Sequence, residues 1–530
     1  MTRIRVMTGA LALLLLTAAC GPAGGNGAAS SNTRPQAGGT LTFDTDADPG
    51  CLDPQQSPLA ASQLISRPVV DSLVSQDPQT LRIKPWLATS WTVSQDATRF
   101  TFQLRQGVTF SDGTPFNGAA VKANFDRVVA PSTKSLLAAS LLAGYAGTQV
   151  NGQSVTVTFS KPNAPFLQAA STAFLGMLSP TAFAAGPQAM CGKPVGSGPF
   201  VVAGHVAQQS VTLNKRAGYS WGPPGAKHQG PAYLDKVLVN VVPENGVRVG
   251  SLRTNQVDTI ANVPPADAGS LPGFQLLSKA QPGTAYSLVI NATGAPWTDV
   301  RLRQAFAKAV DTNQIVNTIY RGRYHRATSV LTPATPGYLN VLPASQYDPA
   351  AANKLLDEAG WTKGADGMRG KDGQPLTIDW TYISPAREQR DLVAQLVQQQ
   401  LKQVGINVRL TPLPVGQVTS LTASGNWQLT DISFVRADGD VLRTVLTSPN
   451  SGFPATQAPQ VPNLLTAATT TTDQGSRDAD YAQAQRLIVQ QASSVPIYDP
   501  TYLLGASNAV HDLTFDPQGL PSFYDAWLAR

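Results

Sequence analysis

The residues able to carry out catalysis or bind a metal ion are few in this chain. Its 530 residues contain four histidines, His205, His228, His325 and His511. None of these forms a close pair such as H-x-x-x-H, the spacing that places two metal ligands on one helix face. We therefore expect each histidine to lie at the surface or in a loop, and we expect neither a metal site nor a cofactor.

An acidic run at residues 44–48 suggests a calcium site but does not complete one. Asp44, Asp46 and Asp48 are spaced like the first ligands of a calcium-binding loop. Such a loop needs glycine at its sixth position and a bidentate glutamate at its twelfth, where this chain has Pro49 and Gln55. These two positions exclude a calcium loop of this type.

A glycine-rich run, Lys193-Pro-Val-Gly-Ser-Gly-Pro-Phe, could bind phosphate or present a nucleophile. It lacks the Lys-Ser/Thr pair of a phosphate-binding loop, and Ser197 lacks the G-x-S-x-G frame of a hydrolase. A tight backbone turn is the simpler interpretation. Because we find no catalytic constellation, the sequence predicts a protein that is not an enzyme.

The chain begins with the features of an export signal. Two arginines precede an apolar run at residues 9–16, which is shorter than the roughly 20 residues that span a bilayer. Small residues then lead to Cys20, and this order resembles a bacterial lipoprotein signal, which is cleaved before the cysteine. Residues 21–39 are rich in Gly, Ala, Ser, Asn and Pro and cannot form a core. We expect residues 1–19 to be removed, Cys20 to carry lipid and residues 20–39 to be a flexible tether; an ordinary secretory signal is the alternative.

The three cysteines predict one disulfide. An odd number of cysteines in an exported chain leaves one of them unpaired. If Cys20 carries lipid, Cys51 and Cys191 remain as a pair in an oxidising compartment. In the chain-entropy model, closing so long a loop stabilises the fold by roughly 4–5 kcal/mol. Two buried free thiols are the alternative.

Size and composition predict a soluble body of at least two lobes. The chain is 42% apolar and 14% charged, as ordinary globular proteins are, and it is too long for one hydrophobic core. Its net charge of +6 falls to +4 without the two signal arginines. A charge so small and scattered does not favour nucleic acid as a partner. The sequence has no second apolar run long enough to cross a membrane, so we expect membrane contact through the lipid alone.

The spacing of apolar residues predicts strands interleaved with helices. In the alternating run at residues 99–104, Phe100, Phe102 and Leu104 fall on one face, as in a half-buried strand. Asn117 is typical of a helix N-cap and predicts a helix to about residue 129. Further elements are predicted as strands at 41–44 and 153–159 and a short helix after Ser179-Pro180.

Helix signals are clearest in the second half of the chain. At residues 300–310, Leu302 and Phe306 share one face, and we expect Arg301, Arg303 and Lys308 to face water. Further elements are predicted as helices at 311–320, 348–360 and 384–405, a hairpin between the last two with turns at Asp366-Gly367 and Asp372-Gly373, and a strand at 406–410. The alternation of strands and helices indicates α/β lobes.

Longer segments resemble one known family. The run Leu81-Arg-Ile-Lys-Pro-Trp-Leu-Ala-Thr-Ser-Trp, followed by Phe100-Thr-Phe-Gln-Leu-Arg-Gln-Gly-Val-Thr-Phe-Ser-Asp-Gly-Thr-Pro-Phe, is similar to a signature of the peptide/nickel/opine solute-binding proteins, family 5 of the extracytoplasmic receptors that serve ABC importers. Further matches follow in the family's order at residues 195–200, 256–258, 289–311, 347–361 and 400–408. Because these matches span nearly the whole mature chain, the resemblance indicates the family, although it does not indicate the ligand.

The resemblance implies a two-lobed α/β fold like that of the periplasmic binding proteins, of type II, closing on a solute at a hinge. Lobe one is expected at residues 40–275 and 485–530, with an extra subdomain at about 76–194, and lobe two at 276–484. The solute contacts both lobes only when they are closed, so binding favours closure, which a permease can detect.

The resemblance also implies ligand contacts. In peptide-binding members, an aspartate of lobe two pairs with the ligand's α-ammonium, and Asp438 matches that residue. Neutralisation of Asp438 by the neighbouring Arg436 is the alternative. A lobe-one loop that lies along the ligand in relatives matches the segment with Leu52 and Asp53. The residues predicted to bind ligand are Asp438, Arg436, Ala437, Gly439, Leu52, Asp53 and Asn291.

Together these features predict a lipid-anchored receptor on the extracytoplasmic face of the cell membrane. It is expected to deliver a small solute, a short peptide, to the permease subunits of an ABC importer, and to be a monomer that does not bind nucleic acid. One alternative is a receptor for a metal chelate or another small solute. A second is an envelope regulator that has kept the fold and lost transport.

Overall fold

The computed structural model describes residues 34–135, 137–343, 346–447 and 450–529. The expected signal and Cys20 lie outside these residues, so cleavage and lipidation stay predictions. Within the described residues, no helix combines the length and the apolar character that a membrane span requires. The helices and strands belong to the unit Pro35–Arg530.

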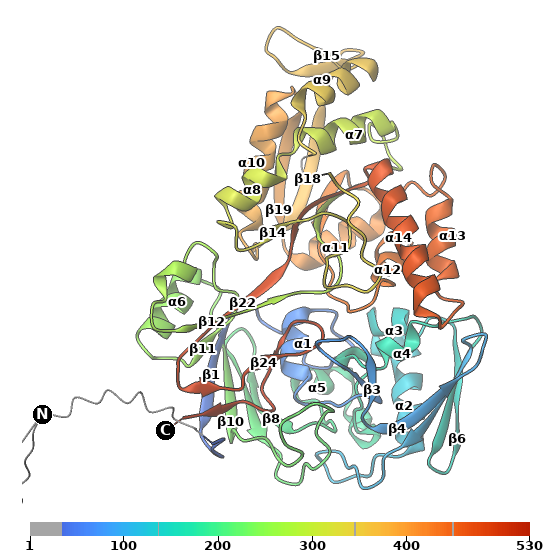
Figure 1. The fold of residues 1–530 in the computed structure, drawn as a ribbon, viewed down its shortest axis with the longest axis vertical. Helices are drawn as coiled ribbons and strands as arrows, with labels where there is room; N and C mark the ends of the chain where they lie inside the picture. Colours follow the sequence, from blue (N-terminus) through green and yellow to red (C-terminus); the bar gives the residue numbers. More distant parts are fainter. Residues whose placement is uncertain (1–33, 136, 344–345, 448–449, 530) are drawn as a thin grey trace, which may run out of the picture. The chain divides into compact units, whose positions relative to one another are not determined.

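A seven-stranded sheet joins the first half of the chain to its C-terminal region (Figure 1). Leu41 and Phe43 of its first strand are fully buried and place that strand in the core. In spatial order the strands are β12 (Gln275–Ala280), β22 (Thr501–Ala506), β11 (Thr259–Ile260), β1 (Thr40–Thr45), β10 (Lys236–Val241), β9 (Ser210–Lys215) and β8 (Phe200–Val206). The strand predicted at residues 41–44 is therefore confirmed as β1.

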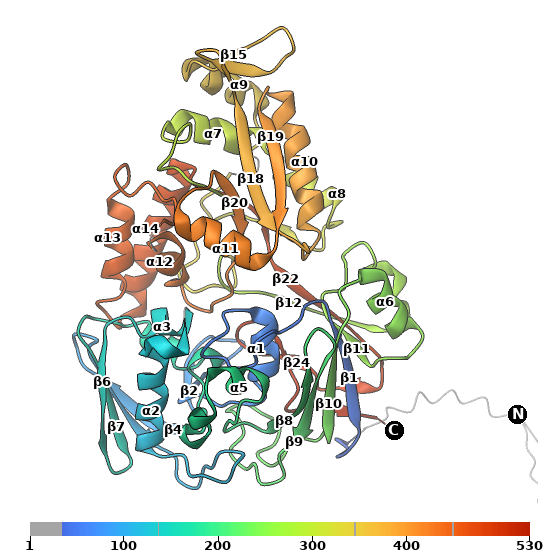
Figure 2. The ribbon, with the colours of Figure 1, turned by 180° about the vertical axis from the view of Figure 1, so that it is seen from behind.

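A six-stranded sheet organises the second half. In spatial order its strands are β14 (His325–Arg326), β21 (Ser494–Asp499), β13 (Tyr286–Ile290), β20 (Leu429–Ile432), β18 (Thr377–Ile383) and β19 (Asn407–Leu413). The parallel strands β18 and β19 are connected by α10 (Arg390–Gln403), which lies beside them in Figure 2. Its other helices include α7 (Val300–Ala309), α8 (Thr312–Thr318) and α9 (Pro349–Glu358).

The chain passes between the two large sheets twice, once from β12 to β13 and once from β21 to β22. This arrangement of two mixed α/β bodies confirms the predicted two-lobed fold. The predicted lobe limits stay a prediction. Strand β21 pairs with β13, so this part of the segment 485–530 belongs to the six-stranded sheet.

A four-stranded sheet is formed by the part of the chain between β1 and β8. It consists of β4 (Ala88–Val93), β5 (Arg99–Leu104), β7 (Ser154–Phe159) and β6 (Tyr145–Asn151), with α2 (Gly118–Val129) packed against it. Phe100 and Phe102 are fully buried, as their alternation predicts. Asn117 Oδ1 accepts a hydrogen bond from Ala120 N at 3.0 Å and confirms the predicted N-cap.

The remaining elements are short. The predicted short helix after Ser179 is a 3₁₀ helix, Pro180–Ala185. The other helices are α1 (Ala60–Ser66), α3 (Leu137–Leu141), α4 (Phe166–Ala169), α5 (Pro187–Gly192), α6 (Asn245–Arg253), α11 (Val415–Ser424), α12 (Val441–Leu446), α13 (Gln460–Ala467) and α14 (Gln474–Gln491). The small sheets comprise β2 (Val74–Gln76) with β3 (Ile83–Pro85), β15 (Thr362–Lys363) with β16 (Arg369–Lys371) and β17 (Gln374–Pro375), β23 (Val510–His511) with β26 (Trp527–Leu528), and β24 (Thr514–Phe515) with β25 (Pro521–Ser522).

Arg303 on α7 was expected to face water, and this prediction is wrong. The residue is fully buried because the C-terminal end of α14 covers that face of α7. Its guanidinium donates to Trp297 O at 2.6 Å and to Gln491 O at 2.7 Å. The buried charge is thus satisfied by carbonyl groups, which a helical wheel of α7 alone does not reveal.

The helix predicted from residue 384 begins later, at Arg390. Residues 384–389 form a loop, because Glu388 and Gln389 have φ angles of +54° and +56°. These values lie in the left-handed region, which a right-handed α-helix does not contain. Residues 384–389 and Arg390, the first residue of α10, are together called the 384–390 loop below.

Cys51 and Cys191 form the predicted disulfide. Around it, Leu52 N donates to Cys191 O at 2.8 Å, and Ser62 Oγ donates to Cys51 O at 2.6 Å. These contacts hold the segment before α1 against α5. The predicted pairing is confirmed, and the alternative of two buried free thiols is wrong.

The glycine-rich run after Lys193 is a tight turn, as its composition suggested. A Cβ at Gly196 would lie 2.1 Å from Val69 O, and one at Gly198 would lie 2.5 Å from Pro68 O. Between them, Ser197 Oγ accepts a hydrogen bond from a backbone N–H at 2.8 Å. The glycines therefore permit close packing against the segment that follows α1.

The disulfide is expected to contribute measurably to stability. The double variant Cys51→Ser/Cys191→Ser should have a free energy of unfolding lower by about 4–5 kcal/mol. The reason is that the cross-link closes a loop of 140 residues and so lowers the conformational entropy of the unfolded chain. Urea denaturation of the chain from residue 34 onward measures this difference. Dithiothreitol-treated wild type should match the variant, and equal stability of the oxidised and reduced proteins would contradict the prediction.

Candidate functional site

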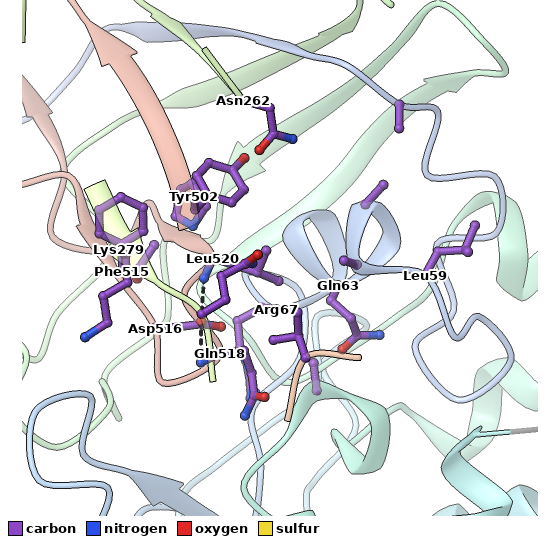
Figure 3. A pocket seen from close by; sticks show the side chains of 18 of the residues that line it. Leu59, Gln63, Arg67, Asn262, Lys279, Tyr502, Phe515, Asp516, Gln518 and Leu520 are labelled. Atoms are coloured by element: carbon purple, nitrogen blue, oxygen red, sulfur yellow. Dashed lines mark hydrogen bonds between the residues drawn. The ribbon is translucent and has the colours of Figure 1, made fainter. Parts of the chain in front are cut away.

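A cavity of about 1730 Å³ is lined by segments from both halves of the fold. The first half of the fold is the body built on the seven-stranded sheet, which includes the C-terminal region of the chain. It contributes Gln63 and Arg67 of the α1 region and residues from the segment 513–525. The second half contributes the 384–390 loop and residues of α11. Figure 3 shows part of this lining, with α1 and the C-terminal segment converging on the same space. Small-molecule pockets typically measure about 300–1,000 Å³, so this one has room for a ligand of several residues.

Arg67 is held rigidly at the end of α1. Its Nη1 donates to Ser72 Oγ and to Ser171 O, both at 3.1 Å. Its Nη2 donates to Val70 O at 2.5 Å, and its Cζ lies 4.9 Å from the ring centre of Trp86. Burial lowers the pKa of Arg67 below its usual value. The Nη1 and Nη2 atoms of the guanidinium therefore donate to groups of the first half of the fold.

Asp516 lies in the turn between β24 and β25 and faces the cavity. Its Oδ1 accepts hydrogen bonds from Gln518 N and Leu520 N, both at 2.9 Å (dashed in Figure 3). Its Oδ2 has no hydrogen-bond partner among the described residues. Burial raises the pKa of Asp516 to about 6, although Arg67 and Lys279 act in the opposite direction.

An ion pair joins the two halves at the cavity. Arg387 in the 384–390 loop places its Nε 3.3 Å from Asp46 Oδ2, just after β1. Asn262 Nδ2 donates to the other carboxylate oxygen at 2.9 Å. Burial alone would raise the pKa of Asp46, but Arg387 and Arg248 outweigh burial and hold it below its usual value. Asp46 is therefore ionised and tied to both halves.

The 384–390 loop is itself anchored to the strand that leads into the second crossing. Arg390 Nη2 donates to Glu388 Oε2 at 3.0 Å and to Ser433 Oγ at 2.7 Å. Tyr498 OH on β21 donates to the same Glu388 oxygen at 2.7 Å. Burial opposes ionisation of Glu388, but Arg390 and Arg387 together lower its pKa. The position of Arg387 thus depends on β21.

Asp438, the residue predicted to bind an ammonium, is paired within the protein. Arg477 on α14 donates from Nη2 to both carboxylate oxygens at 2.9 Å, and Asp438 is 4% exposed. The alternative partner, Arg436, bonds to Asp440 Oδ2 at 2.9 Å instead. Ligand binding by Asp438 stays a prediction, for which Arg477 is a competing partner.

The segment around Ala437 contacts the first half of the fold directly. Arg436 Nε donates to Gln168 Oε1 at 3.2 Å. Ala437 O accepts from Gln76 Nε2 at 3.0 Å, and Ala437 N donates to Gln518 Oε1 at 3.2 Å. Both backbone polar groups of Ala437 therefore bond to protein groups.

The other residues predicted to bind ligand also have protein neighbours. Leu52 and Asp53 are fully buried, and Asp53 pairs with Arg127. Asn291 Nδ2 donates to two backbone carbonyls at 2.9 and 3.1 Å. A Cβ at Gly439 would lie 2.5 Å from a tyrosine ring atom. None of the seven predicted residues is among those that line the cavity.

Comparison with known proteins decides the family. Residues 82–485 match the model of the bacterial extracellular solute-binding proteins, family 5 (middle region). The chain belongs to this family. Family 5 proteins bind small solutes and deliver them to ABC importers, and the predicted transport class is thereby confirmed. The family is one of transport receptors and not of enzymes.

Individual relatives agree with this family. The chain is 29% identical over 464 residues to the glutathione-binding protein GsiB of Salmonella typhi, covering 84% of this chain and 86% of the relative. It is similar to NikA from Brucella suis in complex with Fe(III)-EDTA, with a TM-score of 0.80, 25% identity and coverage of 93% and 100% of the two chains. DppA from Helicobacter pylori in complex with the peptide STSA has the same fold, with a TM-score of 0.79, 24% identity and coverage of 93% and 99%.

The cavity residues of this family 5 protein were not found from its sequence. Arg67, Arg387 and Asp516 each lie in or beside a loop, and they come from three segments far apart in the sequence that only tertiary packing brings to one cavity. Arg387 and Asp46 are 341 residues apart. Asp516-Pro-Gln-Gly has the composition of a turn, but composition does not show which space a turn faces.

The Arg477–Asp438 pair should be important for stability. Arg477→Met is expected to lower the free energy of unfolding by about 3–5 kcal/mol, because it leaves a buried carboxylate without its partner. Urea denaturation measures the loss. The matched control is Arg409→Met, which removes an exposed pair with Asp379 and should lower the free energy of unfolding far less. Losses of similar size in the two variants would contradict the assignment.

Proposed function

We propose that this family 5 protein binds a short peptide in the 1730 Å³ cavity and delivers it to an ABC import permease. The observation that carries the proposal is that both halves of the fold line one large cavity and meet at the Asp46–Arg387 ion pair. The names of similar proteins support the ligand class: GsiB is a glutathione-binding protein, and DppA was solved with a peptide. Direct roles for Asp438 and the other six predicted residues belong to the same proposal, should the lobes rearrange around the ligand.

Closure of the two lobes is the proposed signal to the permease. The bodies expected to move are lobe one, predicted at 40–275 and 485–530, and lobe two, predicted at 276–484, with the two chain crossings as the hinge. Strand β21 moves with lobe two, because it pairs with β13. A solute in the cavity contacts both lobes only when they are closed, so its binding energy shifts the population towards the closed form. The permease then distinguishes loaded from empty receptors.

A lipid on Cys20 is proposed to hold the receptor at the extracytoplasmic face of the membrane, as a monomer. The tether at residues 20–39 would confine the receptor near its permease. Such confinement raises the effective concentration of one partner around the other without any additional contact.

A metal chelate is the second candidate ligand, because NikA, solved with Fe(III)-EDTA, is 25% identical to this chain. The described residues contain no group of three or more His, Cys, Asp or Glu side chains placed to hold a metal ion. A chelate would therefore be bound through its organic part.

Gentle purification should recover the ligand. The chain from residue 34 onward, weighed by native mass spectrometry and then denatured, is expected to release a peptide in near one-to-one amount. Adding the same peptide at a hundredfold excess over its Kd should raise stability by about 2.7 kcal/mol. If nothing is released, and no peptide or chelate shifts the melting temperature, the transport proposal is contradicted.

The anchor can be tested separately in cells. The full chain should fractionate with membranes and incorporate labelled palmitate, whereas Cys20→Ser should incorporate none and lose its membrane association, because a thiol is needed for the lipid attachment. Cys51→Ser is the matched control and should still be labelled. Equal labelling of wild type and Cys20→Ser would contradict lipidation at this residue.

A further inference from the structure

Three of the carboxylates that line the cavity, Asp46, Asp48 and Asp516, differ in how many of their oxygens accept hydrogen bonds from the protein. Asp48 accepts from Gly50 N and from Gln208 N, one on each oxygen, at 3.0 and 3.1 Å. Asp46 is paired with a guanidinium on one oxygen and an amide on the other. Asp516 has both backbone bonds on Oδ1, which leaves Oδ2 without a partner in the described part of the chain. An additional donor can therefore bind at Oδ2 without displacing a protein group.

The cations nearest to Asp516 do not neutralise it by contact. Arg67 directs Nη1 and Nη2 to Ser72, Ser171 and Val70, and Lys279 Nζ donates to a backbone carbonyl, Pro78 O, at 3.2 Å. Neither forms an ion pair with Asp516 within 4 Å. Burial raises the pKa of Asp516 to about 6 in spite of both. Neither cation therefore neutralises the carboxylate by direct contact, and their combined effect on its pKa is smaller than that of burial.

Large apolar side chains line other parts of the same cavity. Leu59, Ile383 and Val415 are 38%, 39% and 43% exposed and all line it. In Figure 3, Leu59 lies beyond Gln63 and Arg67 on the side away from Asp516. Exposed apolar groups inside a cavity favour a ligand that covers them, since covering them removes apolar area from water.

We propose that Asp516 binds a cationic group of the solute, an organic ammonium, while an apolar part of the same solute covers Leu59, Ile383 and Val415. The inference rests on the proposed function and deepens it, because it assigns the charge-recognising residue to the C-terminal segment of lobe one. Asp438, whose two oxygens bond to Arg477, then serves to join α14 to its own lobe. The solute is thus amphipathic, with a free amino group.

The experiment compares free and acetylated amino groups. A library of di- to pentapeptides of Gly, Ala, Ser, Val, Leu and Phe is offered to the chain from residue 34 onward, and native mass spectrometry identifies the tightest binder. Calorimetry then measures the Kd of this peptide and of its N-acetylated form for wild type and Asp516→Asn. Asparagine keeps the Oδ1 acceptor for Gln518 N and Leu520 N, so the fold of the turn should be preserved, which the melting temperature checks.

Acetylation should weaken binding to wild type by about tenfold to a hundredfold, the range of a charge-assisted hydrogen bond. Asp516→Asn should weaken binding of the free peptide by the same factor and abolish the effect of acetylation. Asp48→Asn, which removes a carboxylate whose oxygens are both occupied, should leave the effect of acetylation unchanged. This non-additivity distinguishes a direct contact from a loss of structure.

The pH dependence gives an independent readout. A bound ammonium lowers the pKa of Asp516 below its ligand-free value of about 6, so affinity should be complete above that pH and fall as the pH drops below it. The cations that act on the Asp516 carboxylate are Arg67 and Lys279. Asp71, whose pKa burial raises to about 7, also titrates, so only the difference between wild type and Asp516→Asn is assigned to Asp516.

The outcomes separate the two proposals. If peptides bind and neither acetylation nor Asp516→Asn matters, the inference about Asp516 is overturned and the proposed function stands. If acetylation matters but the loss follows Asp438→Asn instead of Asp516→Asn, the inference is likewise overturned. If no library peptide binds, both the peptide function and the inference are contradicted.

Discussion

The two chain crossings between the large sheets are hydrogen-bonded to each other, and the rest of the structure depends on this contact. Gln281 N donates to Pro500 O at 2.9 Å, and Ala280 pairs with Thr501 at the end of the antiparallel β12–β22 ladder. On the other side of the crossing, Tyr286 pairs with Tyr498. This hydrogen-bonded pair of crossings is the hinge about which we propose that the two lobes close.

The cavity is built around this connection. Tyr498 bonds to Glu388, which lies next to Arg387 in the 384–390 loop, and Arg387 reaches Asp46 on the opposite half. A change in the angle at the crossing is therefore transmitted to the ion pair through one strand and one loop. Each half of the fold contributes both apolar and charged residues to the lining of the cavity. A solute that contacts the whole lining therefore contacts both halves, as expected of a solute receptor.

Local signals in the sequence predicted local structure well. The cap at Asn117 and the alternation through Phe100 and Phe102 depend on residue type and spacing, and both were found. The pairing of Cys51 with Cys191 was predicted from the number of cysteines, with Cys20 assigned to the lipid, and it was found as well. Arg303 was placed wrongly because its environment is set by α14, nearly two hundred residues away. The cavity could not be predicted for the same reason. Its lining comes from segments far apart in the sequence, among them α1, the 384–390 loop and residues 513–525, and only tertiary packing brings these segments together.

The disulfide makes the two sides of the cavity unequal before any solute arrives. Cys51 is covalently joined to Cys191, and Ser62 of α1 bonds to the Cys51 carbonyl, so the side that bears Gln63 and Arg67 is preorganised. The opposite side is formed by the 384–390 loop and α11, which have no such cross-link among the described residues. Ordering the cross-linked side when a solute binds therefore costs little entropy, because the disulfide and the Ser62 hydrogen bond already restrain it.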